Sequence, residues 1–233
     1  MKAIITGATK GIGKAIGIAL MKEGYDLAIN SRSESDLIQT AKEFSVLRKG
    51  GNVIYHQTDM SDKAAVQLFG AFVLDQWGRA DVLINNAGIF IPGKIITEPE
   101  GGLEKMVETN LYSAYYLTRM IVPAMIEKGS GHIFNMCSIA SLIAYPNGGS
   151  YGISKFAMYG MSKALREELK ETGVKVTSIM PGATWSNSWA GVDLPENRLM
   201  KASDIAEVVL SALKMSPSAV VEDIVIRPQL GDL

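Results

Sequence analysis

Tyr151 and Lys155 are the two residues whose types and spacing most directly suggest chemistry. They lie four positions apart, in a segment whose apolar residues recur with a helical period through Leu169. On a helix, this spacing places both side chains on one face, about 5 to 6 Å apart at their β-carbons. The pKa of tyrosine is about 10, and a cation at about 4 to 5 Å could lower it by about three units. The pair is therefore predicted to include a general acid or base, although an amphipathic helix with an exposed lysine has the same spacing.

A glycine-rich turn near residue 10 is predicted to hold a dinucleotide. Residues 6–13 read TGATKGIG, directly after a short apolar run and before a helical pattern. Gly7 allows a tight turn, Gly11 lets the backbone approach a pyrophosphate, and Gly13 permits close packing of helix and strand. The helix N-terminus adds amide groups and a positive dipole. The Gly-Lys-Ser/Thr ending of a phosphate-binding P-loop is absent, so a dinucleotide fits better than ATP; a ligand-free βα turn is the alternative.

Cations, rather than a carboxylate, lie where the adenosine ribose would bind. An acidic residue about 20 positions beyond the glycines would favour NAD, but the second apolar run ends in Asn30, Ser31 and Arg32. Lys10 lies inside the glycine-rich turn. Because Lys10 and Arg32 could both contact a 2′-phosphate, we expect NADP(H) rather than NAD(H) as cofactor. Two solvated surface cations are the alternative interpretation.

Strands and helices that alternate along the chain must position these residues. Stretches of helical spacing separate the short apolar runs, and the clearest is Ile205, Val208, Val209 and Ala212. Strands that are apolar throughout are typical of a parallel sheet covered by helices on both faces. We therefore predict one α/β domain over residues 1–233, a doubly wound parallel sheet of about seven strands, with a substrate loop at about residues 182–201. The predicted strands are centred on Ile4-Ile5, Leu27–Ile29, Val53–Tyr55, Val82–Ile84, Ile133-Phe134, Val176–Met180 and Ile224–Ile226.

Serine residues predict where three of the helices begin. Ser33, Ser61 and Ser203 each stand before a helical pattern with Asp or Glu in its first turn. A serine hydroxyl at this position accepts a hydrogen bond from an unpaired amide of the first turn.

Composition excludes several classes of function. The chain has 23 Lys and Arg against 24 Asp and Glu, so we expect no basic surface for nucleic acid and no anionic membrane partner. The single cysteine, Cys137, and two distant histidines, His56 and His132, argue against a disulfide or a metal site, and we assign them no chemistry. No apolar stretch has the length of a membrane span or a signal peptide core, so we expect a cytoplasmic protein.

Together, these motifs resemble the classical short-chain dehydrogenase/reductase family. The chain also has Asn85-Asn86-Ala87-Gly88 after the fourth predicted strand, Ser138 thirteen positions before Tyr151, and Pro181-Gly182 after the sixth strand. The resemblance covers nearly the whole chain. It implies a Rossmann-type fold and an oxidoreductase similar to NADP-dependent carbonyl or 3-oxoacyl-[acyl-carrier-protein] reductases.

The resemblance implies a role for each matching residue. Tyr151 would be the general acid or base, and Lys155 would bind the nicotinamide ribose and depress the tyrosine pKa. Ser138 would orient the substrate oxygen, and Asn110 would hold a water of the proton relay. Asp59 would contact adenine, and the hydroxyl of Ser186 or Thr184 would hold the nicotinamide carboxamide. The positions expected to bind cofactor, from the loop and from the resemblance, are Gly7, Thr9, Lys10, Gly11, Ile12, Gly13, Ser31, Arg32, Asp59, Met60, Asn86, Ala87, Gly88, Tyr151, Lys155, Pro181, Gly182, Thr184 and Ser186.

The expected substrate is a small carbonyl compound or alcohol. Its pocket walls are predicted to be apolar, which favours a neutral ketone; the candidates are Leu142, Ile143, Tyr145, Trp185 and Trp189. Residues 225–228 read VIRP and lack the Asp-Gly-Gly ending common among acyl-carrier-protein reductases. A 3-oxoacyl-thioester reductase and a non-catalytic NADP-binding regulatory protein remain alternatives. The resemblance also implies a homotetramer or homodimer packed through the helices that contain Asn110 and Tyr151.

Overall fold

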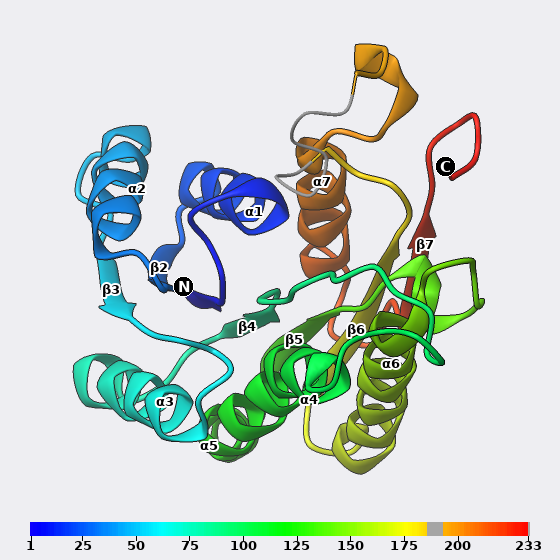
Figure 1. Cartoon of the computed structure of the whole chain (residues 1–233). Helices are drawn as coiled ribbons and strands as arrows, with labels where there is room; N and C mark the ends of the chain where they lie inside the picture. Colours follow the sequence, from blue (N-terminus) through cyan, green and yellow to red (C-terminus); the bar gives the residue numbers. More distant parts are fainter. Residues whose placement is uncertain (186–192, 233) are drawn as a thin grey trace.

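A parallel β-sheet of seven strands organises the computed structural model, which describes residues 1–185 and 193–232. The strand order is β3-β2-β1-β4-β5-β6-β7, and every neighbouring pair is parallel (Figure 1). The doubly wound fold predicted from the sequence is therefore confirmed. The strands are β1 (Lys2–Ile5), β2 (Asp26–Ser31), β3 (Val53–Gln57), β4 (Val82–Asn85), β5 (Gly131–Met136), β6 (Val174–Pro181) and β7 (Asp223–Ile226).

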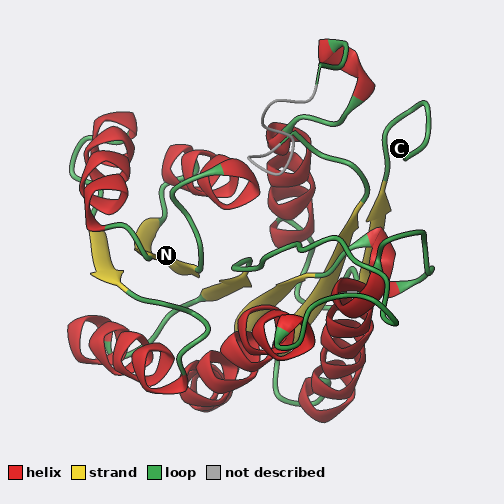
Figure 2. Cartoon of the chain, in the orientation of Figure 1, coloured by secondary structure: helices red, strands yellow, loops and turns green. Residues whose placement is uncertain are grey.

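Helices cover both faces of the sheet, as the uniformly apolar strands predicted (Figure 2). Helices α1, α2 and α7 lie on one face, and α3, α4, α5 and α6 lie on the other (Figure 1). The α-helices are α1 (Gly11–Lys22), α2 (Glu34–Leu47), α3 (Lys63–Trp77), α4 (Gly102–Val107), α5 (Ser113–Lys128), α6 (Gly149–Leu169) and α7 (Ala202–Leu213). A π-helical turn, η1 (Glu108–Tyr112), joins α4 to α5. None of the described helices is both long and apolar enough to cross a bilayer.

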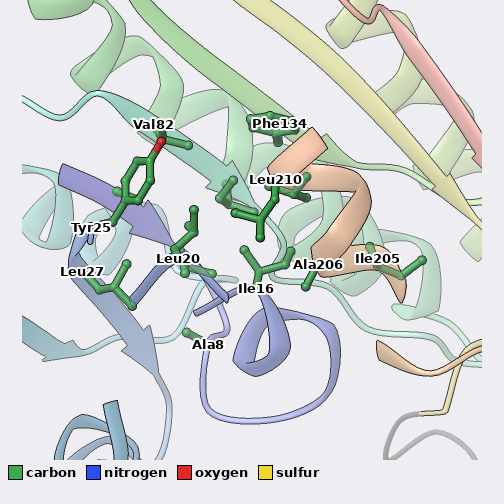
Figure 3. Close-up of a cluster of buried hydrophobic side chains, with 14 of the residues drawn as sticks. Ala8, Ile16, Leu20, Tyr25, Leu27, Val82, Phe134, Ile205, Ala206 and Leu210 are labelled. Carbon is green, nitrogen blue, oxygen red and sulfur yellow. The ribbon is translucent and has the colours of Figure 1, made fainter. Parts of the chain in front are cut away.

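Successive residues of a strand belong to two different hydrophobic cores. In β1, Ile5 packs among the side chains of α1, α2 and α7, whereas Ile4 packs among those of α3 and α5. In the first core, Ile16 of α1 lies near Ala206 and Leu210 of α7 (Figure 3). Because strand side chains alternate between faces, a strand in the middle of this sheet is covered on both sides and is apolar at most positions.

The winding of the sheet reverses at β1, which lies between β2 and β4. Connections leave this point toward opposite edges, so the loops after β1 and β4 diverge and leave a crevice at the carboxyl ends of the strands. The glycine-rich turn follows β1, and Asn86–Gly88 follows β4. The fold therefore brings these two sequence motifs to one edge of the sheet.

The predicted helix starts are confirmed in one case and wrong in two. Ser33 precedes α2 and accepts a hydrogen bond from the Asp36 amide at 3.2 Å. Asp62, rather than Ser61, precedes α3, because its carboxylate accepts from two amides of the first turn. Helix α7 follows Lys201, so Ser203 lies inside its first turn.

Candidate active site

A cavity of about 950 Å³ opens at the carboxyl edge of the sheet. It runs from the glycine-rich turn after β1 to the segments that follow β5 and β6. This is the size and position of a ligand site in an open α/β sheet. Most of the residues predicted from the sequence line it, namely Gly7, Thr9, Lys10, Gly11, Ile12, Ser31, Arg32, Asp59, Met60, Asn86, Ala87, Gly88, Ser138, Tyr151, Lys155, Pro181, Gly182 and Thr184.

The remaining predicted residues have different positions. Gly13 and Asn110 lie behind the lining, where they contact residues that form it. Ser186 and Trp189 lie outside the described residues. Of the other predicted wall residues, Ile143 and Tyr145 line the cavity, but Leu142 and Trp185 are not among its described lining residues.

The glycines of the turn are required by backbone conformation and by close contact. Gly7 and Gly11 have positive φ angles of 66° and 54°. A β-carbon on Gly13 would lie 2.4 Å from the Gly7 carbonyl oxygen and 2.5 Å from Asn86 Nδ2. No side chain caps α1 at Lys10, so the first amides of this helix face the cavity as donors for an anion. The turn thus fits a dinucleotide pyrophosphate.

Two residues that the sequence analysis missed hold this turn in place. Thr6 Oγ1 accepts hydrogen bonds from the amides of Asn86 and Ala87, both at 2.9 Å. Asn30 Oδ1 accepts from the Gly7 amide at 2.9 Å. Asn86 Nδ2 donates to the Thr6 carbonyl oxygen at 2.8 Å, so this side chain joins the two loops of the crevice. A polar residue directly after a run of apolar residues, as at Asn30, was the available signal in the sequence, and the structure buries it.

The two predicted cations at the β2 end of the cavity differ in their surroundings. Lys10 forms an ion pair with Asp36 at 2.8 Å, a partner that the sequence analysis did not foresee. Arg32 is exposed at the cavity rim, close enough to Asp59 to help lower the pKa of that carboxyl group. The larger cause is the hydrogen bond that Asp59 accepts from the Ser61 amide. Among the described residues, Lys10 therefore has a neutralising ion pair and Arg32 does not.

Tyr151 and Lys155 lie on one face of α6, as their spacing predicted. Lys155 Nζ is 5.7 Å from the centroid of the Tyr151 ring. The ammonium group is buried and donates a hydrogen bond to the Met136 carbonyl oxygen at 2.8 Å. Lys155 thereby ties α6 to the end of β5.

The expected lowering of the Tyr151 pKa by Lys155 is wrong for this structure. Burial raises the pKa of Tyr151, and a hydrogen bond with the Ser138 side chain offsets only part of that rise. Burial also lowers the pKa of Lys155 to about 8. The physical reason is desolvation, which disfavours both phenolate and ammonium. At neutral pH, Tyr151 is consequently protonated and able to donate a proton.

Ser138 lies in the turn that follows β5. Its hydroxyl accepts from the Ala140 amide at 3.2 Å and begins a 3₁₀ turn, η2 (Ile139–Ser141). Ser141 Oγ in turn accepts from the Ser138 amide at 3.2 Å and donates to the Lys155 carbonyl oxygen at 2.8 Å. Ser141, which the sequence analysis missed, therefore couples the position of Ser138 to that of α6.

Asn110 joins three segments beneath the cavity. Its Oδ1 accepts from the Ile89 amide at 2.7 Å, while Nδ2 donates to the Ile89 carbonyl oxygen at 3.0 Å and to Ser154 Oγ at 2.9 Å. The residue lies in the π-helical turn η1. A β-carbon on Gly88 would lie 3.1 Å from Asn110 Oδ1 and 3.6 Å from Lys155 Nζ, so both groups lie directly behind the cavity wall.

Phe90 is a further wall residue that the sequence analysis missed. Its ring packs edge-to-face against the Tyr151 ring, with centroids 4.9 Å apart. Phe90 lines the cavity together with Ile143 and Tyr145. Burial raises the pKa of Tyr145 to about 12, so its phenol is neutral. The wall around Tyr151 is therefore apolar and aromatic.

Burial also shifts the pKa values of the cysteine, which lines the cavity, and of the buried histidine, which is not among its described lining residues. Burial raises the pKa of the Cys137 thiol to about 11, and burial lowers the pKa of His132 to about 3. Within residues 1–185 and 193–232, no group of three His, Cys, Asp or Glu side chains is arranged to hold a metal ion.

Comparison with known proteins places this geometry in a family. A family model described as short chain dehydrogenase matches residues 1–196. The chain belongs to the short-chain dehydrogenase family. It is therefore an oxidoreductase, and its seven-stranded sheet is the fold of solved structures of this family.

Three short-chain dehydrogenase relatives illustrate the range of similar proteins. Sepiapterin reductase of Chlorobaculum tepidum is 31% identical over 238 residues, covering 99% of this chain and 97% of that protein. D-beta-hydroxybutyrate dehydrogenase of Rhizobium meliloti is 36% identical over 180 residues, covering 77% and 70%. The structure of an alcohol dehydrogenase from the archaeon Thermococcus sibiricus, complexed with 5-hydroxy-NADP, has a TM-score of 0.91 and 29% identity, covering 100% and 98%.

Proposed function

We propose that this short-chain dehydrogenase is an NADP(H)-dependent enzyme that interconverts a ketone or aldehyde and an alcohol by metal-free hydride transfer. The observation that carries the proposal is the single cavity that Tyr151, Ser138 and Lys155 share with the glycine-rich turn. The alcohol dehydrogenase complexed with 5-hydroxy-NADP, which covers the full length of this chain, supports the choice of cofactor.

The cofactor would lie along the cavity from the β2 end to the β6 end. The first amides of α1 would hold its pyrophosphate, and Arg32 would contact the 2′-phosphate. Asp59 and Met60 would border the adenine, and Asn86–Gly88 the middle of the cofactor. Segment Pro181–Thr184, with Ser186, would hold the nicotinamide. When bound, NADPH supplies the hydride that the carbonyl carbon receives.

Tyr151 would supply the proton in the reduction. Because burial keeps its phenol protonated, it can donate to the carbonyl oxygen as charge develops there. Ser138 would donate a second hydrogen bond to the same oxygen. Lys155 would stabilise the resulting phenolate and contact the ribose hydroxyls, and Asn110 would hold a water on the path that returns the proton. In alcohol oxidation, Tyr151 would first have to lose its proton and act as the base.

The substrate would be an uncharged carbonyl compound with an apolar substituent. Phe90, Ile143 and Tyr145 surround the Tyr151 end of the cavity, and none of them carries a charge at neutral pH. An apolar wall stabilises a bound hydrocarbon group roughly in proportion to the area removed from water.

We also propose that the protein assembles as a homo-oligomer through α5 and α6. Large hydrophobic side chains on these helices are exposed, including Tyr115, Ile153 and Phe156. Exposed large apolar side chains on the helices of a proposed interface are what an interaction surface would bury. Light scattering measures the mass, and a monomer at micromolar concentration contradicts this assignment.

A turnover assay tests the proposed activity. Oxidation of NADPH is followed by absorbance with a panel of ketones, aldehydes and acetoacetyl thioesters, and at least one uncharged ketone is expected to be reduced. Tyr151→Phe should reduce turnover by about 10²-fold or more, whereas Tyr159→Phe should not, because Tyr159 lies on the same helix but bonds to Asp223. No turnover across the panel, with NADPH binding intact, contradicts the proposal and supports a regulatory protein.

A further inference from the structure

The segment that follows β7 folds against the segment that follows β6 (Figure 1). Asp232 connects the two through both of its carboxylate oxygens. Oδ1 accepts a hydrogen bond from the Ala183 amide at 2.8 Å, and Oδ2 accepts from Arg227 Nε at 2.6 Å. Ala183, Arg227 and Asp232 all line the cavity that contains Tyr151.

The backbone around Asp232 is built to admit its carboxylate. A β-carbon on Gly182 would lie 2.1 Å from Asp232 Oδ1, so a larger residue at position 182 would displace this carboxylate. The guanidinium group of Arg198 donates to the carbonyl oxygens of Gly231 and Asp232, at 2.8 and 3.2 Å. These main-chain contacts fix the carboxylate beside the Ala183 amide independently of the ion pair with Arg227.

Arg227 is a cation within reach of a bound substrate. Ile226 pairs with Pro181 across β7 and β6, and β6 pairs with β5, whose end leads to Ser138. Two strand spacings separate the end of β5 from the end of β7, a distance of about 10 Å. A carboxylate on a short chain could span that distance from a carbonyl group held at Ser138. The carboxylate of Asp232 already forms an ion pair with the guanidinium group that would bind the substrate carboxylate.

We propose that Asp232 is a positioning and specificity-determining residue of this enzyme. It holds the segment after β6 through the Ala183 amide, and it neutralises Arg227 so that the cavity favours uncharged carbonyl substrates over those with a carboxylate. Removing the charge of Asp232 alone therefore frees Arg227 to bind a substrate carboxylate. This inference rests on the proposed carbonyl reductase activity.

Asp232→Asn separates the charge from the backbone contact. The asparagine oxygen still accepts from the Ala183 amide, but the amide group cannot neutralise Arg227. The probe is an oxo acid and its methyl ester, compared as kcat/KM at several chain lengths. The ratio of acid to ester should rise about two- to fivefold, the size expected when a partly exposed ion pair is exchanged. The double variant with Arg227→Gln should lose that gain.

Asp232→Ala removes the backbone contact as well. Its KM for NADPH should rise several-fold, and Asp232→Asn should restore most of that loss, a rescue that a general loss of folding would not produce. Asp223→Asn is the matched control, because Asp223 lies on β7 and forms an ion pair with Lys163 of α6 but does not line the cavity among the described residues. It should leave both measurements unchanged.

The outcomes distinguish this inference from the activity on which it rests. An unchanged ratio of acid to ester in Asp232→Asn, with the ester still reduced, overturns the role of Asp232 and leaves the proposed function standing. A gain that persists in the double variant overturns the role of Arg227 in the same way. If the wild-type protein binds NADPH but reduces neither probe nor any compound of the carbonyl panel, the proposed function and this inference are both wrong.

Discussion

Lowering the pH should destabilise the protein through a single buried histidine. His132 lies on β5, where its ring stacks on Phe134 with centroids 4.0 Å apart and its Nε2 bonds to Thr177 Oγ1 at 2.7 Å. Burial, helped by the positive charge of Lys175, lowers the pKa of His132 to about 3. The imidazole is therefore neutral in the folded protein throughout the range in which the unfolded chain becomes protonated.

The sign and size of the effect follow from this difference in pKa. Below a pKa of about 6.5 the unfolded chain binds a proton that the folded chain does not, so the free energy of unfolding falls as the pH falls toward 3. Between pH 7 and pH 5 the loss amounts to about 2 kcal/mol. Carboxyl groups with lowered pKa values, such as Asp59, lose their contribution at lower pH and do so equally in a histidine variant.

His132→Gln isolates this contribution, because glutamine can still bond to Thr177 but does not titrate. Urea unfolding followed by circular dichroism at pH 7, 6 and 5 gives the free energy of unfolding of each variant. The wild type should lose about 2 kcal/mol more than His132→Gln between pH 7 and pH 5. His56→Gln, on the partly exposed strand β3, is the control and should follow the wild type. Parallel pH profiles for the wild type and His132→Gln would refute the reasoning.

Four substitutions test the site and its support. Tyr151→Phe should reduce kcat by about 10²- to 10⁴-fold while the Kd for NADPH, measured by fluorescence titration, changes only a few-fold; near-normal turnover would contradict its role. Arg32→Ala should lower the ratio of NADP to NAD efficiency about tenfold in a coenzyme comparison, and an unchanged ratio would remove Arg32 from the 2′-phosphate site. Gly13→Ala should raise the Kd for NADPH about tenfold or more, because its β-carbon would displace the Gly7 carbonyl or Asn86; unchanged binding would show that the turn relaxes freely. A β-carbon on Gly160, in α6, would have no atom within 4 Å. Gly160→Ala should therefore raise the free energy of unfolding by roughly 0.5 to 1 kcal/mol without affecting NADPH binding.

The fold was predictable because its signals are local and repeated. Each strand is a short run of apolar residues, such as Leu27–Ile29, and such a run has few alternatives once helical patterns flank it. Single capping residues were less predictable. Ser61 and Asp62 are adjacent polar residues that can both cap a helix, and in the structure Asp62 Oδ1 accepts from the amides of Ala64 and Ala65 whereas Ser61 bonds to Asp59. Sequence spacing does not distinguish them.

The residues of the site were easier to predict than their electrostatics. Sequence spacing alone predicted that Tyr151 and Lys155 share one helix face. Their pKa values, however, depend on how deeply the folded chain buries them. The ion pair of Lys10 with Asp36 likewise depends on how α2 is oriented beside the glycine-rich turn. The contact of Asp232 with Ala183 joins residues 49 positions apart, and no local sequence pattern predicts it.

For Asn110, a loss of activity on substitution would not by itself show that the residue takes part in the chemistry. Its amide group satisfies both the N–H and the carbonyl oxygen of Ile89 and also holds the hydroxyl of Ser154, one position before Lys155. Any replacement would leave unpaired groups in the protein interior and shift the neighbouring wall. A slow Asn110 variant would consequently report on how the pocket is assembled as much as on water held for proton transfer, and solvent isotope effects would be needed to tell the two apart.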